Sequence, residues 1–155
     1  MSSSAHYLYS GAIHVATEPC NISTVLGTCI SVCLWDEQLR YGGMNHFLLP
    51  LWDGSGLASP RYGNVAVMRL IEDLEAAGAK RSRLKAKVFG GKEVGNDRNA
   101  LINIGWRNAT IAMEELKEAN IQVTAMEVGG DYGRKIIFDT ATGGVKLKRF
   151  RARPK

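Results

Sequence analysis

Residues 23–36 read Ser-Thr-Val-Leu-Gly-Thr-Cys-Ile-Ser-Val-Cys-Leu-Trp-Asp, and residues 41–50 read Tyr-Gly-Gly-Met-Asn-His-Phe-Leu-Leu-Pro. Both runs are rich in β-branched, apolar and aromatic residues, and the break between them is short and polar. This pattern predicts two antiparallel strands, over residues 29–35 and 41–49, that are joined by a hairpin turn. We expect the rest of the chain to be arranged around this hairpin.

The register of the hairpin decides which side chains meet across it. With Glu37 and Gln38 as the two loop residues, the numbers of cross-strand partners add up to 75. Cys29 would then lie directly opposite His46, on the same face of the sheet. A slip of one residue would instead place Ile30 opposite His46 and turn the face over.

A thiol and an imidazole at hairpin distance are two parts of a cysteine-nucleophile site. Ser23 and Thr24, a few residues upstream, carry hydroxyls that could orient the histidine. From the residues alone three readings of Cys29 stay open: a nucleophile, a buried core cysteine, or a metal ligand. His46 alone is equally typical of a structural histidine, and Ser23 and Thr24 of ordinary strand residues.

Gly27 and Thr28 form a turn signal immediately before the cysteine. Free backbone N–H groups in such a turn could bind the oxyanion that forms when a thiolate attacks a carbonyl or an amide. We therefore include both residues as candidate substrate or oxyanion residues.

The length of 155 residues and the hydrophobic fraction of 45% predict one globular domain, which we assign to residues 1–150. No apolar run approaches the roughly 18 residues that span a bilayer, and the N-terminus lacks a signal-peptide pattern. We therefore expect a cytoplasmic protein.

Three cysteines do not suggest a disulfide framework. On one strand Cys29 and Cys33 would be about 13 Å apart, which is too far for a disulfide and argues against a zinc site that uses both.

Positive charge is concentrated at the C-terminus. Residues 146–155 hold six basic residues and no acidic one. Because those six charges exceed the net total of +5, the rest of the chain is at −1. A basic tail of this kind could bind an acidic protein, nucleic acid or an anionic membrane, or it could be a plain solvated end. The chain has no nucleic-acid-binding motif to favour the second partner.

The remaining pattern predicts an α+β fold, with mixed and antiparallel β-sheets packed against two main helices. Helices are expected from Asn64 to residue 77 and from Asn103 to about residue 119, with both asparagines as N-caps. Seven or eight strands complete the fold, and residues 1–10 are expected to be loose. The expected strands cover residues 11–16, 22–26, 29–35, 41–49, 84–89, 121–127, 136–138 and 145–147.

Two segments are expected to be loops. Residues 50–63 are rich in Gly, Ser and Pro and begin four residues after His46. Long loops in compact domains are often functional, so this segment is either one wall of a substrate cleft or a plain connection. Residues 92–103 lack the glycine spacing of a nucleotide-binding loop.

Residues 23–36 resemble the nucleophile segment of the CheD family of chemoreceptor glutamine deamidases, and residues 43–50 resemble its histidine segment. Asn-Ile-Gly-Trp-Arg-Asn at 103–108 and Gly-Gly-Asp-Tyr-Gly-Arg at 129–134 are also similar to the family. Further similar segments, at 61–64, 90–91 and 138–143, complete a match in family order over most of the chain.

The resemblance implies a fold like that of deamidating bacterial toxins and the conversion of receptor glutamines to glutamate, with release of ammonia. It implies Cys29 as nucleophile, His46 as general base and no metal or cofactor. The third member, a threonine in the family, is expected at Ser23 or Thr24. Alignment by distance from the cysteine puts the family threonine on Ser23, so this chain has a serine where the family pattern has a threonine. A second, milder departure is Thr28, where the family usually has serine.

The resemblance also implies partners: the cytoplasmic domains of chemoreceptors as substrates, and the phosphatase CheC as a regulatory partner. We expect the chain to be a monomer. The alternative function is a non-catalytic module that regulates CheC through the same surface, and the serine at position 23 is the only sequence hint for it.

Overall fold

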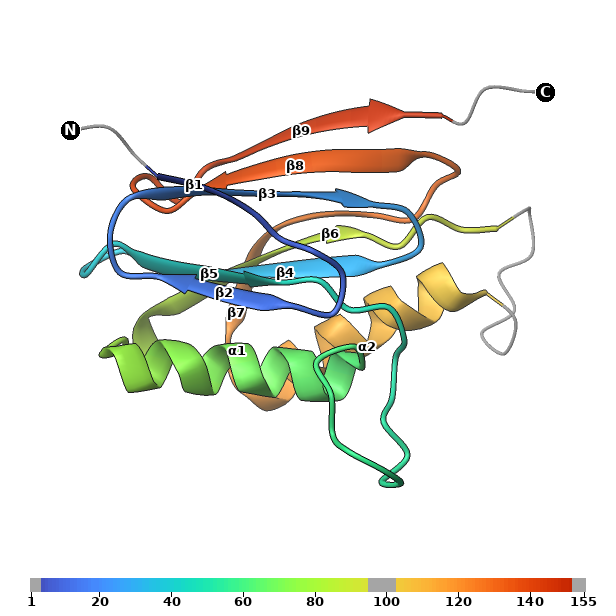
Figure 1. Ribbon diagram of the computed structural model, residues 1–155, viewed down its shortest axis with the longest axis horizontal. Coiled ribbons are helices and arrows are strands. Elements are labelled where there is room, and N and C mark those ends of the chain that lie inside the picture. The colour runs from blue at the N-terminus through green and yellow to red at the C-terminus, as the bar shows by residue number, and fades with distance from the viewer. Residues whose placement is uncertain (1–3, 95–102, 152–155) are drawn as a thin grey trace.

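The computed structural model describes residues 4–94 and 103–151. The central part of the expected loop at 92–103 and the last four residues lie outside this range. In the described ranges the chain forms nine strands, two α-helices and one short 3₁₀ helix (Figure 1). The elements are β1 Ser4–Tyr7, β2 Ile13–Ala16, β3 Cys20–Leu26, β4 Ile30–Asp36, β5 Tyr41–Asn45, α1 Gly63–Ala77, η1 Arg81–Arg83, β6 Leu84–Gly90, α2 Ile104–Glu118, β7 Gln122–Val128, β8 Gly133–Asp139 and β9 Val145–Phe150.

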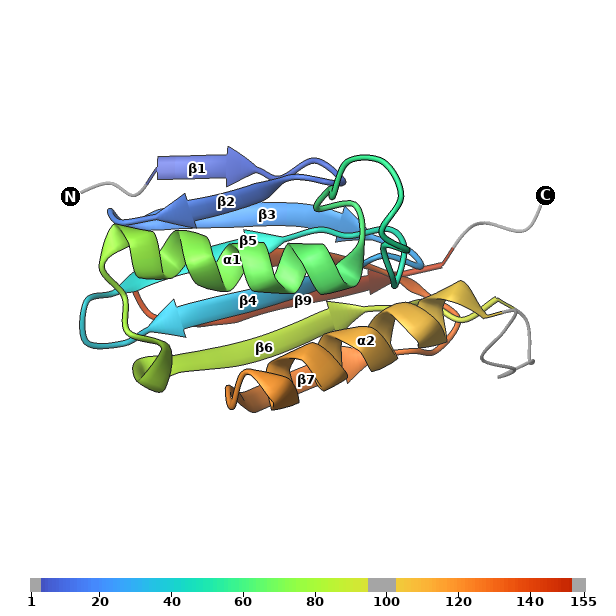
Figure 2. The same cartoon turned by 90° about the horizontal axis from the view of Figure 1, so that it is seen from below.

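The strands form two sheets, and the whole molecule has three layers. The first sheet has the order β1-β3-β8-β9, and the second has the order β2-β5-β4-β6-β7. The second sheet lies between the first sheet and the helices (Figure 1). Both helices cover its outer face side by side, as the view from below shows (Figure 2). The prediction of an α+β fold with two helices is confirmed.

Each pair of layers encloses its own hydrophobic core. Alternate residues of β4 point to opposite faces, as a pleated strand requires. Ile30, Val32 and Leu34 pack toward the helices with the apolar stripe of α1. Cys33 packs between the two sheets, against residues of β3 and β8 such as Ile22 and Phe138. The face of a residue on β4 or β5 therefore decides whether it meets the helices or the other sheet.

The predicted helices are present, with one cap corrected. Asn103 caps α2, because its side chain accepts a hydrogen bond from the Trp106 N–H at 3.3 Å. Gly78 ends α1 in a left-handed conformation, at φ 117°. The prediction that Asn64 caps α1 was wrong. The helix begins one residue earlier, and the Asn64 Oδ1 accepts instead from the Trp52 N–H at 3.0 Å, holding the preceding loop.

The β4–β5 hairpin forms, but its predicted register was wrong. Asp36 pairs with Tyr41, so the numbers of partners add up to 77 rather than 75. The loop has four residues instead of two, because the Asp36 Oδ1 accepts hydrogen bonds from the N–H groups of Gln38 and Leu39. Arg40 closes the loop in a left-handed conformation, at φ 57°.

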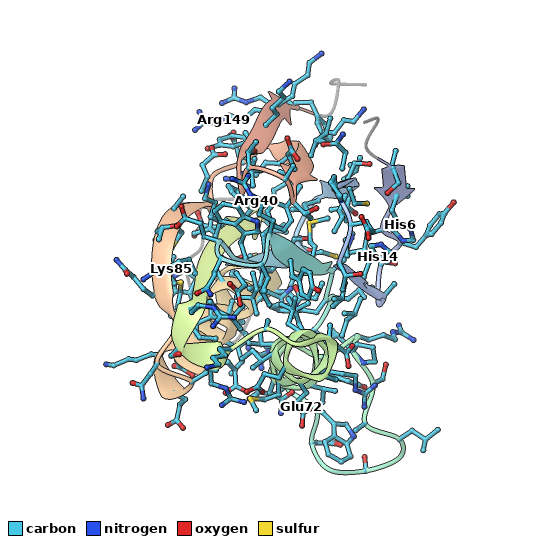
Figure 3. The ribbon with its side chains drawn as sticks, turned by 90° about the vertical axis from the view of Figure 1, so that its left-hand side faces the viewer. His6, His14, Arg40, Glu72, Lys85 and Arg149 are labelled. Carbon is cyan, nitrogen blue, oxygen red and sulfur yellow. The ribbon has the colours of Figure 1, made fainter. Side chains whose placement is uncertain are left out.

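Residues 4–10 are ordered, contrary to the expectation that residues 1–10 are loose, and residues 1–3 lie outside the described range. β1 pairs in parallel with β3 at the edge of the first sheet, and Leu8, which follows it, is buried. β2 lies at the matching edge of the second sheet. His6 of β1 and His14 of β2 stack across the two edges, with ring centroids 3.7 Å apart (Figure 3). All four residues of β1 are exposed, so no alternation of apolar and polar residues marks this strand in the sequence.

The basic C-terminal segment begins as a strand rather than as a tail. Its residues up to Phe150 belong to β9, which pairs antiparallel with β8. Lys148 lies directly opposite Lys135, and both are exposed. Arg149 forms an ion pair with Glu127. In the part of the chain that the structure describes, no helix is long and apolar enough to cross a membrane.

Candidate active site

Cys29 lies at the entrance to β4, directly after the bend at Gly27 and Thr28. Its side chain is half-buried against the core between the two sheets. Its carbonyl oxygen accepts a hydrogen bond from the Gly91 N–H at 2.9 Å. The end of β6 approaches so closely that a Cβ atom on Gly90 would lie 2.2 Å from this oxygen. Only glycine fits at position 90, and the tight contact holds the nucleophile segment in place.

His46 follows β5 immediately and is 5% exposed. Its backbone carbonyl accepts a hydrogen bond from the Gly11 N–H at 2.7 Å. Its neighbour Asn45 interrupts the hydrogen-bond ladder between the strands, because the Asn45 Oδ1 accepts a hydrogen bond from the Val32 N–H at 2.8 Å. The ladder resumes with Phe47, so the histidine sits in a short break with its ring on the inter-sheet side.

Thr24, in the middle of β3, provides the contact from the opposite sheet. Its Oγ1 lies 2.8 Å from the Nδ1 of His46 and donates to the Leu8 carbonyl oxygen at 2.7 Å. A hydroxyl has one hydrogen, and here that hydrogen goes to the Leu8 carbonyl. The Thr24 oxygen must then accept from His46, which puts the imidazole proton on Nδ1. The Nε2 of His46 is left unprotonated and can act as a base.

Ser23 does not take part in this contact. Neighbouring residues of a strand face opposite sides, and Ser23 lies on the outer side of the first sheet, in a shallow hollow with Asn21 and Asp139. The structure therefore brings Thr24, and not Ser23, to the histidine. The expectation that put the family's threonine on Ser23 came from an alignment by distance from the cysteine, and such an alignment does not show which face of the strand a residue occupies.

The thiol and the imidazole are on the same face but are not hydrogen-bonded to each other in the described part of the chain. With partners adding up to 77, His46 lies across from Ser31, so Cys29 is its diagonal neighbour. Such diagonal pairs are about 7–8 Å apart at Cα and stay within reach of longer side chains. Catalytic hydrogen bonds are often long before substrate binds, so this arrangement is compatible with proton transfer.

Burial keeps both groups neutral. It lowers the pKa of His46 from 6.5 to about 4, because a buried imidazolium loses its hydration. Burial also raises the pKa of the Cys29 thiol, and a hydrogen bond from the Thr28 side chain opposes this in part. The resting pair at neutral pH is therefore a thiol and a neutral imidazole, rather than a thiolate and an imidazolium.

Three successive carbonyl groups fix the path of the nucleophile loop. The Gly27 carbonyl accepts from the Lys92 N–H at 2.9 Å, and the Thr28 carbonyl accepts from the side chain of Asn108 at 3.0 Å. The Cys29 carbonyl accepts from Gly91, as described above. Within the described residues, the N–H groups of Thr28 and Cys29 donate to no acceptor. They remain the candidates for binding an oxyanion.

Sequence reasoning missed several of these supporting residues. Leu8 could have been noticed as a lone large apolar residue in a polar N-terminal segment. Asn108 was read only as part of a helix start, although it lies in one of the segments that resemble the CheD family. Nothing local in the sequence indicated that Gly11 would hold the carbonyl of His46.

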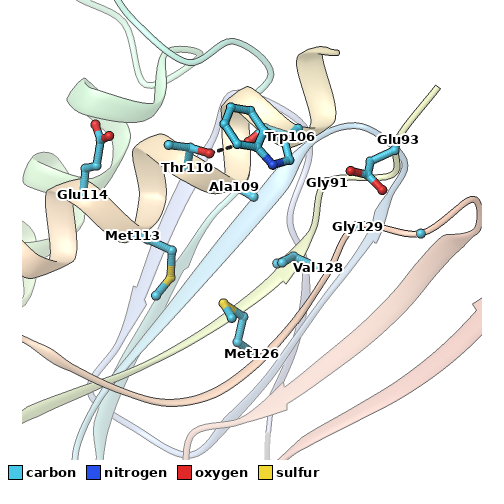
Figure 4. A pocket seen from close by; sticks show the side chains of 11 residues that line it. Gly91, Glu93, Trp106, Ala109, Thr110, Met113, Glu114, Met126, Val128 and Gly129 are labelled. Atoms are coloured by element: carbon cyan, nitrogen blue, oxygen red, sulfur yellow. Dashed lines mark hydrogen bonds between the residues drawn. The ribbon is translucent and has the colours of Figure 1, made fainter. Parts of the chain in front are cut away.

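An apolar pocket of about 400 Å³ lies beside α2, and Figure 4 shows Trp106, Met113, Met126 and Val128 around it. None of the candidate catalytic side chains lines this pocket. The loop at 50–63 projects from the helix side of the molecule (Figure 1), and its role as a cleft wall stays a prediction. Among the residues that the structure describes, no three His, Cys, Asp or Glu side chains converge as metal ligands would.

Comparisons with known proteins identify the family of the chain. A family profile described as CheD chemotactic sensory transduction matches residues 48–149. A probable chemoreceptor glutamine deamidase CheD from Trichlorobacter lovleyi is 51% identical over 144 residues, which cover 93% of this chain and 89% of the relative. A protein of the same name from Sulfurimonas denitrificans is 45% identical, with 92% of each chain covered. A match over 93% of the chain necessarily includes residues 23–46, where the candidate catalytic groups lie. The chain therefore belongs to the CheD family.

Proposed function

We propose that the protein is a protein-glutamine deamidase, which hydrolyses glutamine side chains of chemoreceptors to glutamate and releases ammonia. The observation that carries this proposal is the 2.8 Å contact between the Thr24 Oγ1 and the His46 Nδ1, on the same face as Cys29. This contact supports His46 as an oriented base with a free Nε2, on the same face of the sheet as the thiol of Cys29. The names of the relatives, probable chemoreceptor glutamine deamidases, support this substrate class.

In the first half of the reaction, the sulfur of Cys29 attacks the amide carbon of the glutamine side chain. The thiol proton moves to the Nε2 of His46, and the new S–C bond converts the amide oxygen into an oxyanion. Thr24 stabilises the resulting imidazolium through its oxygen, which accepts from Nδ1. The backbone N–H groups of Thr28 and Cys29 bind the oxyanion, a contribution of roughly 3–4 kcal/mol per donor in a well-studied protease.

In the second half, the protonated His46 gives its proton to the amide nitrogen, the C–N bond breaks and ammonia leaves. Cys29 is now joined to the substrate as a thioester. A water molecule attacks the thioester while His46 takes one of its protons, and that proton returns to the sulfur. The products are glutamate and the free thiol, so protons balance without any further reactant.

The proposal is tested by incubating the protein with the cytoplasmic domain of a chemoreceptor. Mass spectrometry of its peptides and an ammonia assay should both report conversion of glutamine to glutamate. Cys29→Ala and His46→Ala should abolish both signals. Cys33→Ala is the matched control, because Cys33 lies on β4, four residues after Cys29, but is buried in the core between the sheets. Conversion that survives Cys29→Ala would refute the mechanism.

A non-catalytic module that regulates CheC remains the alternative, and the same assay separates the two. Binding to CheC without conversion of any receptor glutamine would favour the module. The sequence hint for it was the serine at position 23, and this hint weakens because the contact with His46 comes from Thr24.

We further propose that the receptor meets the basic strand β9 and that the reaction takes place in the cytoplasm, where these receptor domains lie. Lys135 and Lys148 face each other across β8 and β9, although like charges in that position repel. An acidic partner would relieve this repulsion. Deleting the segment would remove a strand, so the sharper test is Lys146→Glu with Lys148→Glu. Receptor binding that is unchanged in this double variant would refute the contact.

A further inference from the structure

Asn108 joins the two halves of the candidate site from the helix layer. It lies on α2, is 0% exposed, and its Nδ2 donates to two backbone carbonyls at 3.0 Å each. One carbonyl belongs to Thr28, immediately before the nucleophile, and the other to Leu48, two residues after the base. Both hydrogens of the amide are thereby used on the two segments that carry Cys29 and His46.

The bond to Thr28 sets the direction of the next N–H group. In a trans peptide the carbonyl and the following N–H point in opposite directions. Because the Thr28 carbonyl points to Asn108, the Cys29 N–H points away from the helix layer. The thiol packs against the core between the sheets, on the side of the strand away from the helices. The Cys29 N–H and the thiol are therefore directed away from the same helix.

We propose that Asn108 is a positioning residue that holds the Thr28–Cys29 peptide so that the Cys29 N–H binds the oxyanion. It acts through the backbone and does not touch the substrate. Through Leu48 it also fixes the nucleophile loop relative to the segment that follows His46. This inference rests on the proposed deamidase function, because the oxyanion forms only in that reaction.

The chemistry of the side chain makes an amide the suitable group here. Two carbonyl oxygens need two donors, and an asparagine amide supplies both from one nitrogen. A carboxylate of the same shape has no hydrogen to donate and would repel both oxygens. Rotation of the Thr28–Cys29 peptide plane would then relieve the repulsion. After that rotation a carbonyl group would occupy the position in which the Cys29 N–H must bind the oxyanion.

The test compares Asn108→Asp and Asn108→Ala with the wild-type protein, using deamidation of a receptor domain as the assay. We expect kcat to fall by about 10²–10³-fold, the loss measured when one oxyanion donor is removed, while KM changes little. Alkylation of Cys29 by iodoacetamide forms no oxyanion, so its rate should stay near the wild-type value in both variants. Lowering the pH should partly restore the kcat of Asn108→Asp, because a protonated carboxyl group regains one hydrogen-bond donor.

Ala112→Gly is the matched control. Ala112 lies one helical turn further along α2, is 0% exposed and contacts neither carbonyl through a side-chain hydrogen bond. It should lose stability, because glycine is less favourable than alanine in a helix, but keep the wild-type kcat per folded molecule.

The outcomes distinguish a failure of the proposed role of Asn108 from a failure of the proposed deamidase function. An unchanged kcat in folded Asn108→Ala, with an active wild-type protein, would overturn the role of Asn108 alone. Equal losses of kcat and of the alkylation rate would also overturn it, because they would indicate a general disordering of the loop. A wild-type protein that converts no receptor glutamine would overturn both the role and the proposed function.

Discussion

Replacing His46 by asparagine should change how the stability of the protein depends on pH. In the folded protein burial lowers the pKa of His46 from 6.5 to about 4, whereas the unfolded chain titrates near the ordinary value. Above pH 6.5 both states are neutral at this residue. Between pH 6.5 and 4 only the unfolded state binds the proton, so acid favours unfolding. At 1.36 kcal/mol per unit, this single histidine costs about 3 kcal/mol of stability by pH 4.

Urea unfolding at pH 7, 5.5 and 4.5 measures this loss. The wild-type protein should lose stability faster than His46→Asn as the pH falls, and the difference should approach about 1.4 kcal/mol per pH unit. Asparagine suits the comparison because its amide can still donate to the Thr24 oxygen. The pKa of His14 is also lowered by burial, but its contribution is common to both proteins and cancels. Parallel stability curves would mean that His46 titrates normally, and the argument for a neutral buried base would fail.

The remaining predictions concern the groups around His46 and Cys29. Thr24→Val leaves two buried polar groups without a partner, which should cost about 1–3 kcal/mol and lower kcat by about 10²-fold or more. Ser23→Ala, on the outer face of the same strand, should change stability by less than about 0.5 kcal/mol and leave kcat unchanged. Equal effects of the two variants on kcat would contradict the assignment of Thr24 as the third catalytic residue. Gly90→Ala puts a Cβ atom 2.2 Å from the Cys29 carbonyl oxygen and should slow alkylation of the thiol by iodoacetamide. A normal alkylation rate in a stably folded variant would show that this contact does not hold the nucleophile.

The parts of the fold that depend on local patterns could be predicted from the sequence. The apolar stripes and the cap at Asn103 located both helices. The hairpin of β4 and β5 was predicted, but its loop was taken as two residues, and the side chain of Asp36 stabilises four. The resulting error in register was two residues. Because strand faces alternate with period two, Cys29 and His46 still lie on one face.

What could not be predicted was the contact between layers. Thr24 meets His46 because β3 of one sheet packs over β5 of the other, and no periodicity within either strand records this packing. The same applies to Asn108, whose partners are backbone carbonyls that any sequence would supply. Choosing between Ser23 and Thr24 needed the pairing of the sheets, since the two hydroxyls are adjacent in the chain and face opposite sides.

The site also depends on Leu8, which directly follows the edge strand β1, in a way that can be tested separately from the fold. The Leu8 carbonyl takes the hydroxyl hydrogen of Thr24 and so keeps the His46 proton on Nδ1. Without that carbonyl the hydroxyl can donate to Nδ1, and the proton then moves to Nε2, where it blocks the base. A wrong tautomer lowers kcat about 10⁴-fold in a serine protease. We therefore expect deletion of residues 1–8 to lower kcat per folded molecule, and not only the fraction of molecules that fold. Leu8→Ala loses the same buried side chain but keeps the carbonyl, so its kcat per folded molecule should stay near the wild-type value. If the two variants lose kcat equally, the tautomer is not set by this carbonyl.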